Sequence, residues 1–169
     1  MKSDMCTFRQ EETDMRDGFI RTAAATPKIK VADPVHNRET ICRIIEEYEK
    51  KGAELLVFPE LCLSGYTCND LFQQEILLEQ VKEELKNLVD FTKGRKMLLF
   101  AGLPWEHEGK LYNVAAAICD GELLGLVTKT NMPNYSEFYE LRHFTPGMEI
   151  PVLTDWLDTW VPMGTNLLF

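Results

Sequence analysis

The sequence predicts an α/β protein in which a β-sheet packs against helices. Apolar runs at residues 19–26 and 55–58 flank an amphipathic stretch at residues 37–51. Strand, helix and strand in this order, within about 40 residues, are typical of a βαβ unit. A second amphipathic stretch, residues 70–92, is again followed by an apolar run at residues 97–103. Helices and strands are therefore expected to alternate along this part of the chain.

Each of the first elements has its own signal. Residues 19–26 are predicted to form a short buried strand that Pro27 closes. The stretch at residues 37–51 has apolar side chains at the spacing of one helix face, and Gly52 then ends the helix. These apolar side chains are Ile41, Ile44, Ile45 and Tyr48. The compact run at residues 55–58 suits a strand that is covered on both faces.

The second helix, residues 70–92, is predicted from a stripe of apolar side chains among charged ones. The stripe consists of Leu77, Val81, Leu85 and Leu88. Residues 97–103 resume the sheet, and residues 111–119 and 122–127 are predicted to be two further strands. The Asp-Gly dipeptide between these two strands favours a type I′ hairpin turn.

The remaining part of the chain carries weaker signals. Residues 129–147 form a long polar and aromatic segment, and loops of that length are often functional. Trp156 and Trp160, which are four residues apart, are expected to pack together on a helical turn. Residues 165–169 are expected to open another strand.

Composition excludes several classes of function. The chain has 169 residues and a formal net charge of −9 at pH 7, with no basic block. Nucleic acid and anionic membranes are therefore not expected as partners. The longest apolar run, residues 97–105, is much shorter than the ~20 residues of a membrane span. The first residues lack the apolar core of a signal peptide, which favours a cytoplasmic protein, and residues 1–17 are expected to be an arm outside the core.

The five cysteines indicate neither a disulfide framework nor a metal site. They are irregularly spaced, and no cysteine or histidine pair has the spacing of zinc ligands. Since a free cysteine behaves as a small apolar side chain, we expect reduced and mostly buried thiols.

Two charged residues directly follow apolar strands. Glu60 comes after Leu-Val-Phe-Pro, and Lys129 comes after Leu-Gly-Leu-Val-Thr. In open α/β sheets, reactive groups collect at the carboxyl ends of strands. A carboxylate and an ammonium held there could pair, or one could take a proton while the other stabilises negative charge. The alternative is that both side chains simply face water.

Longer motifs surround both residues. The segment that contains Glu60, residues 57–66, resembles the first signature of the nitrilase, or carbon–nitrogen hydrolase, superfamily. The segment that starts at Lys129, residues 129–140, resembles the second signature, and residues 142–147 continue it. Three further stretches resemble the amidase domains of glutamine-dependent NAD⁺ synthetases, namely residues 24–27, 134–144 and 164–169.

The resemblance implies a nitrilase-type α-β-β-α four-layer sandwich. Residues 18–169 would form its amino-terminal part, a partial glutaminase domain, and the nucleophilic cysteine of the family would follow Phe169. The chain alone is therefore expected to be inactive. Cys62 and Cys68 are poor substitutes for that nucleophile, because the family places its cysteine elsewhere.

The same resemblance implies a role for each site residue. Glu60 would be the general base that takes the proton of the thiol. Lys129 would stabilise the oxyanion formed from the side-chain amide of glutamine, and Glu140 would position Lys129. Tyr135 and Phe138 would line the glutamine pocket.

The implied function is glutamine hydrolysis that supplies ammonia for the ATP-dependent amidation of deamido-NAD⁺ to NAD⁺. No metal or cofactor is implied for this domain. ATP and deamido-NAD⁺, with Mg²⁺, would bind a separate synthetase domain, and the intact enzyme would be a homo-oligomer. Two alternatives are a non-catalytic assembly module of the same fold and a stand-alone amidase of the same superfamily. Residues 134–144 favour the synthetase over the stand-alone amidase.

Overall fold

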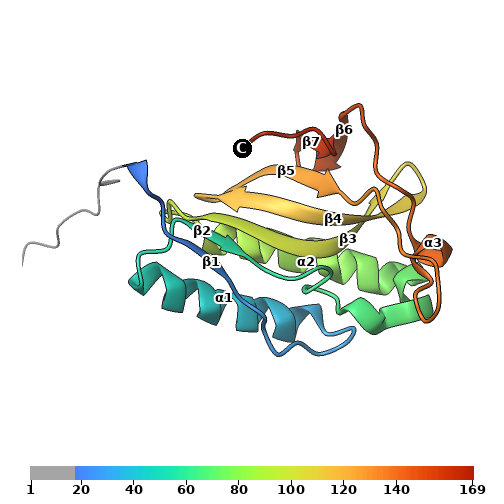
Figure 1. The fold of residues 1–169 in the computed structure, drawn as a ribbon, viewed down its shortest axis with the longest axis horizontal. Coiled ribbons are helices and arrows are strands. Elements are labelled where there is room, and N and C mark those ends of the chain that lie inside the picture. Colours follow the sequence, from blue (N-terminus) through green and yellow to red (C-terminus); the bar gives the residue numbers. More distant parts are fainter. Residues whose placement is uncertain (1–17) are drawn as a thin grey trace, which may run out of the picture.

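The computed structural model describes residues 18–169, in which the strands form a single mixed sheet with two long helices packed against one face (Figure 1). The expected arm, residues 1–17, lies outside the described residues. The strand order is β1-β2-β3-β4-β5-β7-β6. The strands are β1 (Thr22–Ala24), β2 (Leu55–Val57), β3 (Leu98–His107), β4 (Lys110–Cys119), β5 (Glu122–Thr128), β6 (Val152–Trp156) and β7 (Thr159–Gly164). The helical elements are α1 (Pro34–Lys50), the 3₁₀ segment η2 (Tyr66–Gln73), α2 (Glu75–Phe91) and α3 (Glu140–His143).

Helix α1 begins three residues earlier than the apolar spacing predicts. Asp33 caps it by accepting a hydrogen bond from the backbone N–H of His36, and Pro34 occupies the first turn, where a missing N–H costs nothing. The helix ends before Gly52, whose φ of 72° suits a glycine. The expected apolar face is in place, with Ile41 and Ile45 fully buried against the sheet.

The second helix starts later than expected, at Glu75 instead of residue 70. Residues 66–73 form the 3₁₀ segment η2, and Asn69 at φ 49° interrupts regular helix there. The predicted stripe of α2 is confirmed, because all four of its apolar side chains are buried. Neither α1, α2 nor any other helix within residues 18–169 is long and apolar enough to cross a membrane.

The predicted β4–β5 hairpin is confirmed. Its turn residues Asp120 and Gly121 have φ values of 47° and 78°, as a type I′ turn requires.

Two expectations for the residues from β6 onward are wrong. Trp156 lies on a strand and is buried, whereas Trp160 is 60% exposed, so they do not pack on a helical turn. Residues 165–169 form no strand.

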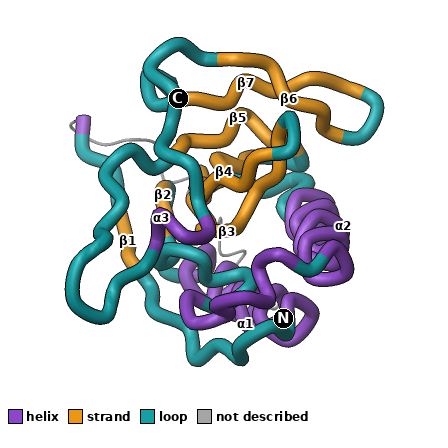
Figure 2. The backbone as a smooth tube through the Cα atoms, turned by 90° about the vertical axis from the view of Figure 1, so that its right-hand side faces the viewer, coloured by secondary structure: helices purple, strands orange, loops and turns teal. Residues whose placement is uncertain are grey.

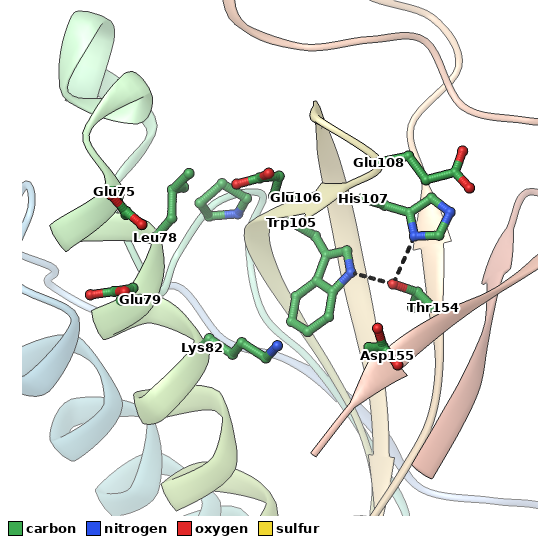
Figure 3. A pocket seen from close by; sticks show the side chains of 11 residues that line it. Glu75, Leu78, Glu79, Lys82, Trp105, Glu106, His107, Glu108, Thr154 and Asp155 are labelled. Atoms are coloured by element: carbon green, nitrogen blue, oxygen red, sulfur yellow. Dashed lines mark hydrogen bonds between the residues drawn. The ribbon is translucent and has the colours of Figure 1, made fainter. Parts of the chain in front are cut away.

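The sheet curls, so that β6 reaches back to β3 although three strands separate them in the sheet. Figure 2 shows β3, β4, β5 and β7 one above the other, from bottom to top. The indole N–H of Trp105 in β3 donates to Oγ1 of Thr154 in β6 over 3.0 Å (Figure 3). The rings of Trp105 and Trp156 lie 6.1 Å apart. Lys82 of α2 stands over the same indole, 5.4 Å from the ring centre. A cavity of about 320 Å³ opens between α2, β3 and β6.

Within residues 18–169, helices cover only one face of the sheet. Strand residues alternate between faces, and Leu56 is buried on the helix side while its neighbour Val57 is 39% exposed. The expectation that residues 55–58 are covered on both faces is therefore wrong. Residues 19–26 are also not a buried strand, because β1 is the edge of the sheet and Phe19 is 79% exposed. Residues 18–169 thus supply one helical layer and one curled sheet of the expected sandwich.

Candidate active site

A sharp turn after β2 presents Glu60. The backbone of Phe58 still donates to the carbonyl of Phe100 in β3 over 2.8 Å, and the chain then turns through Leu61, whose φ is 51°. The turn lies directly on Gly102 of β3: a Cβ there would stand 2.4 Å from the amide nitrogen of Leu61 and 2.6 Å from the carbonyl oxygen of Pro59. Only a residue without a side chain lets the turn approach so closely.

The register of the β4–β5 hairpin places Lys129. Val114 of β4 pairs with Thr128 of β5, so the next residue, Lys129, lies beside Asn113. The backbone N–H of Lys129 donates to the carbonyl of Asn113 over 2.9 Å. Glu60 and Lys129 therefore come from two separate strand ends and meet across β3 and β4.

The predicted loop, residues 129–147, folds back and delivers Glu140 to the same place. Gly147 donates its N–H to the carbonyl of Lys129 over 2.7 Å, and Thr145 donates to Leu111 over 2.7 Å, which closes the loop on β4 and β5. Within the loop, α3 begins at Glu140, which is 5% exposed. A buried carboxylate of this kind needs a cationic partner.

Lys129 is that partner and contacts both carboxylates. Its Nζ lies 2.6 Å from Oε1 of Glu60 and 2.7 Å from Oε2 of Glu140. The expected proximity of Glu60 and Lys129 is confirmed, and Glu140 joins them. Burial disfavours the charge on Lys129, but hydrogen bonds and ion pairs to Glu140 and Glu60 outweigh it and raise the pKa of Lys129. The side chain therefore remains an ammonium.

Two further residues, for which the sequence predicts no role, complete the network. Tyr66 of η2 donates its hydroxyl to Oε1 of Glu140 over 2.7 Å, and the side-chain amide of Asn113 donates to Oε1 of Glu60. Burial and the neighbouring Glu140 carboxylate raise the pKa of Tyr66 well above its ordinary value, so its hydroxyl remains a donor. The available signal for Asn113 was an amide side chain inside an otherwise apolar strand.

Glu60 and Lys129 line a cavity of about 310 Å³ on the sheet face away from the helices. Its other walls are mainly apolar side chains, including Val57, Phe100 and Val127. A carboxylate and an ammonium at an apolar wall interact more strongly with a substrate than they would in water. Glu60 can therefore take up a proton, and Lys129, next to it, can stabilise an anion.

The predicted substrate-binding residues do not line this cavity. The rings of Tyr135 and Phe138 contact each other edge to face, with centres 5.6 Å apart. Tyr135 is 68% exposed, and Phe138 lines a smaller cavity of about 120 Å³ beside Tyr66 and Glu140. Their role in binding glutamine stays a prediction.

Cys62, two residues after Glu60, is a packed thiol. It is 1% exposed, and its Sγ lies 3.6 Å from the carbonyl of Gly102. Burial raises the pKa of the Cys62 thiol to about 12, so almost none of it is the reactive thiolate near neutral pH.

We expect iodoacetamide at pH 8 to modify Cys62 at least ~100-fold more slowly than Cys119, because the half-buried Cys119 is more accessible. Mass spectrometry of peptides from the folded chain measures both rates. In denaturant the two cysteines should react alike. Equal rates in the folded chain would contradict the burial of Cys62.

Comparison with known proteins identifies a family and several relatives. The carbon-nitrogen hydrolase family matches residues 21–161. A glutamine-dependent NAD(+) synthetase from Mycobacterium leprae (strain TN) is 35% identical over 152 residues, which are 90% of this chain and 22% of that protein. One from Aquifex aeolicus (strain VF5) is 39% identical over 158 residues, which are 88% of this chain and 27% of that protein. The chain thus spans about a quarter of the length of these relatives.

A solved structure shows the same fold. The crystal structure of a glutamine-dependent NAD(+) synthetase from Cytophaga hutchinsonii superimposes with a TM-score of 0.81 at 28% sequence identity, over 86% of this chain and 25% of that one. The predicted α/β fold class of the nitrilase type is confirmed. The family match spans most of the chain, including β2 and β5, whose ends carry Glu60 and Lys129. The chain therefore belongs to the carbon-nitrogen hydrolase family.

Proposed function

We propose that this chain supplies the general base and the oxyanion-stabilising cation of a glutaminase. The observation that carries the proposal is the position of Lys129, whose ammonium bridges Glu60 and the buried Glu140 at the edge of a cavity. The similarity to glutamine-dependent NAD(+) synthetases supports glutamine as the substrate. In this proposal the released ammonia amidates deamido-NAD⁺ to NAD⁺.

The chemistry assigns one step to each residue. Glu60 takes the proton of a cysteine thiol, and the thiolate attacks the amide carbon of glutamine. The amide oxygen becomes an oxyanion, which Lys129 stabilises through its ammonium. Glu140 holds Lys129 in place. When the C–N bond breaks, the nitrogen takes the proton from Glu60 and leaves as ammonia, and water then hydrolyses the thioester to glutamate.

The thiol and the amidation chemistry are proposed to come from outside residues 18–169. Cys62 is a packed thiol of high pKa and does not suit the role. The relatives are about four times as long as the part that this chain matches, which leaves room for a site that binds ATP, Mg²⁺ and deamido-NAD⁺. We propose that the whole polypeptide works in the cytoplasm, where thiols stay reduced, as a homo-oligomer.

The substitution Glu60→Gln in the whole polypeptide tests this function. It removes the base but keeps the shape, so NAD⁺ formation from glutamine should fall at least ~100-fold. NAD⁺ formation from added ammonium should stay within twofold, because free ammonia bypasses the hydrolysis. Both rates are measured from the NAD⁺ produced. Equal loss of both activities, or of neither, would contradict the assignment of Glu60.

A further inference from the structure

Asn113 is a buried amide in the strand between Glu60 and Lys129. It is 3% exposed, and its backbone carbonyl and its side-chain amide contact two different site residues. Its backbone carbonyl accepts the N–H of Lys129 over 2.9 Å, while its side chain contacts Oε1 of Glu60. Since a carboxylate only accepts hydrogen bonds, the atom of Asn113 that faces Glu60 must be the donor Nδ2.

The two oxygens of Glu60 have different surroundings. Oε1 accepts from Nδ2 of Asn113 and from Nζ of Lys129, 2.6 Å away. No hydrogen bond from residues 18–169 reaches Oε2. Two donors on one oxygen fix the rotation of the carboxylate, and they leave the other oxygen available to accept a proton.

We infer that Asn113 is a positioning residue that aims Oε2 of Glu60 at the nucleophile. The inference rests on the proposed glutaminase function. In the step concerned, the S–H bond of the thiol breaks, an O–H bond forms at Oε2, and the sulfur keeps the electron pair with which it attacks the amide carbon. Without Asn113 the carboxylate keeps only its contact with Lys129 and can rotate about its side-chain bonds.

The contact itself is tested by stability, independently of any activity. The variants Asn113→Leu, Glu60→Ala and the double variant are compared by the melting temperature of the whole polypeptide. Residues in direct contact give non-additive losses, so the double variant should melt about 2–4 °C above the value that the two single losses predict.

Thr154→Val is the matched control, because Thr154 is a buried polar strand residue that bonds Trp105 instead. Its loss should add to that of Glu60→Ala. Additive losses for Asn113 and Glu60 would overturn the inference.

The positioning role is tested by kinetics. In Asn113→Leu, kcat for glutamine should fall at least tenfold while KM stays within twofold, because the base is misaligned and the substrate contacts remain. Ammonium-dependent NAD⁺ formation should not change, and Thr154→Val should change neither kcat nor KM. An unchanged kcat in Asn113→Leu, beside a strong loss in Glu60→Gln, would overturn the role of Asn113 alone. If the unmodified polypeptide makes no NAD⁺ from glutamine, the proposed function and the role of Asn113 both fail, while the melting experiment still decides the contact.

Discussion

Replacing Lys129 with methionine should reduce glutamine hydrolysis by the whole polypeptide ~100- to 1,000-fold, the usual effect of removing an oxyanion-stabilising group. The substitution also leaves the buried Glu140 without its cation. Removing one partner of a buried ion pair typically costs about 3–5 kcal/mol of unfolding free energy, and we expect about 3 kcal/mol because Lys129 is partly exposed. Rates of glutamate release and denaturant unfolding measure the two effects.

Lys93→Met provides the matched control for this prediction. Lys93 also pairs with a carboxylate, Asp90, at 2.7 Å, but both side chains are more than half exposed. Exposed pairs contribute at most about 1 kcal/mol, so this variant should keep its stability and its activity. If Lys129→Met were no more harmful than Lys93→Met, the contacts of Lys129 with Glu60 and Glu140 would contribute neither to stability nor to catalysis.

Replacing Gly102 with alanine should displace Glu60 without touching any charged group. The added Cβ would lie 2.4 Å from the amide nitrogen of Leu61 and 2.6 Å from the carbonyl of Pro59, and these backbone atoms cannot move aside alone. We expect a loss of about 3 kcal/mol of stability from this overpacking. A shift of about 1 Å in a reacting group can lower a rate ~100-fold, which is the loss of glutamine hydrolysis that we expect.

Gly125→Ala is the control for Gly102→Ala. Gly125 is also a strand glycine, but the atom nearest to a Cβ there would be 3.1 Å away, and two of the three nearest atoms belong to movable side chains. Its effects should be small. Equal behaviour of the two variants in unfolding and in glutamine hydrolysis would show that the close packing under the Glu60 turn is unimportant.

The parts of the fold that the sequence predicts correctly depend on local signals. The helix faces follow from apolar spacing, and the β4–β5 hairpin follows from its Asp-Gly turn. The β6–β7 hairpin was missed because its turn contains Leu157 at φ 53° and no glycine. The curl of the sheet brings Thr154 within hydrogen-bond distance of Trp105, and nothing local in the sequence joins residues so far apart.

In the site, too, local sequence signals find some residues, whereas others depend on contacts between distant parts of the chain. Glu60 and Lys129 stand out because each follows an apolar strand, but their roles, and that of Glu140, were predicted from the motif resemblance. Asn113 and Tyr66 complete the network through register and loop folding, which bring together residues with no common sequence pattern. The exposed faces of β1 and β2 were predicted as buried because an apolar run does not show which of its faces a neighbouring layer covers.

A structure of the whole polypeptide bound covalently to a glutamine analogue, with an electrophilic carbon at the amide position, tests the central claim most directly. The account predicts that the analogue occupies the cavity beside Val57 and Phe100. Its oxygen should lie about 3 Å from Nζ of Lys129, a normal hydrogen-bond distance, and Oε2 of Glu60 should face the attached sulfur. An analogue whose oxygen points away from Lys129, or one bound in the cavity between α2, β3 and β6 (Figure 3), would contradict it.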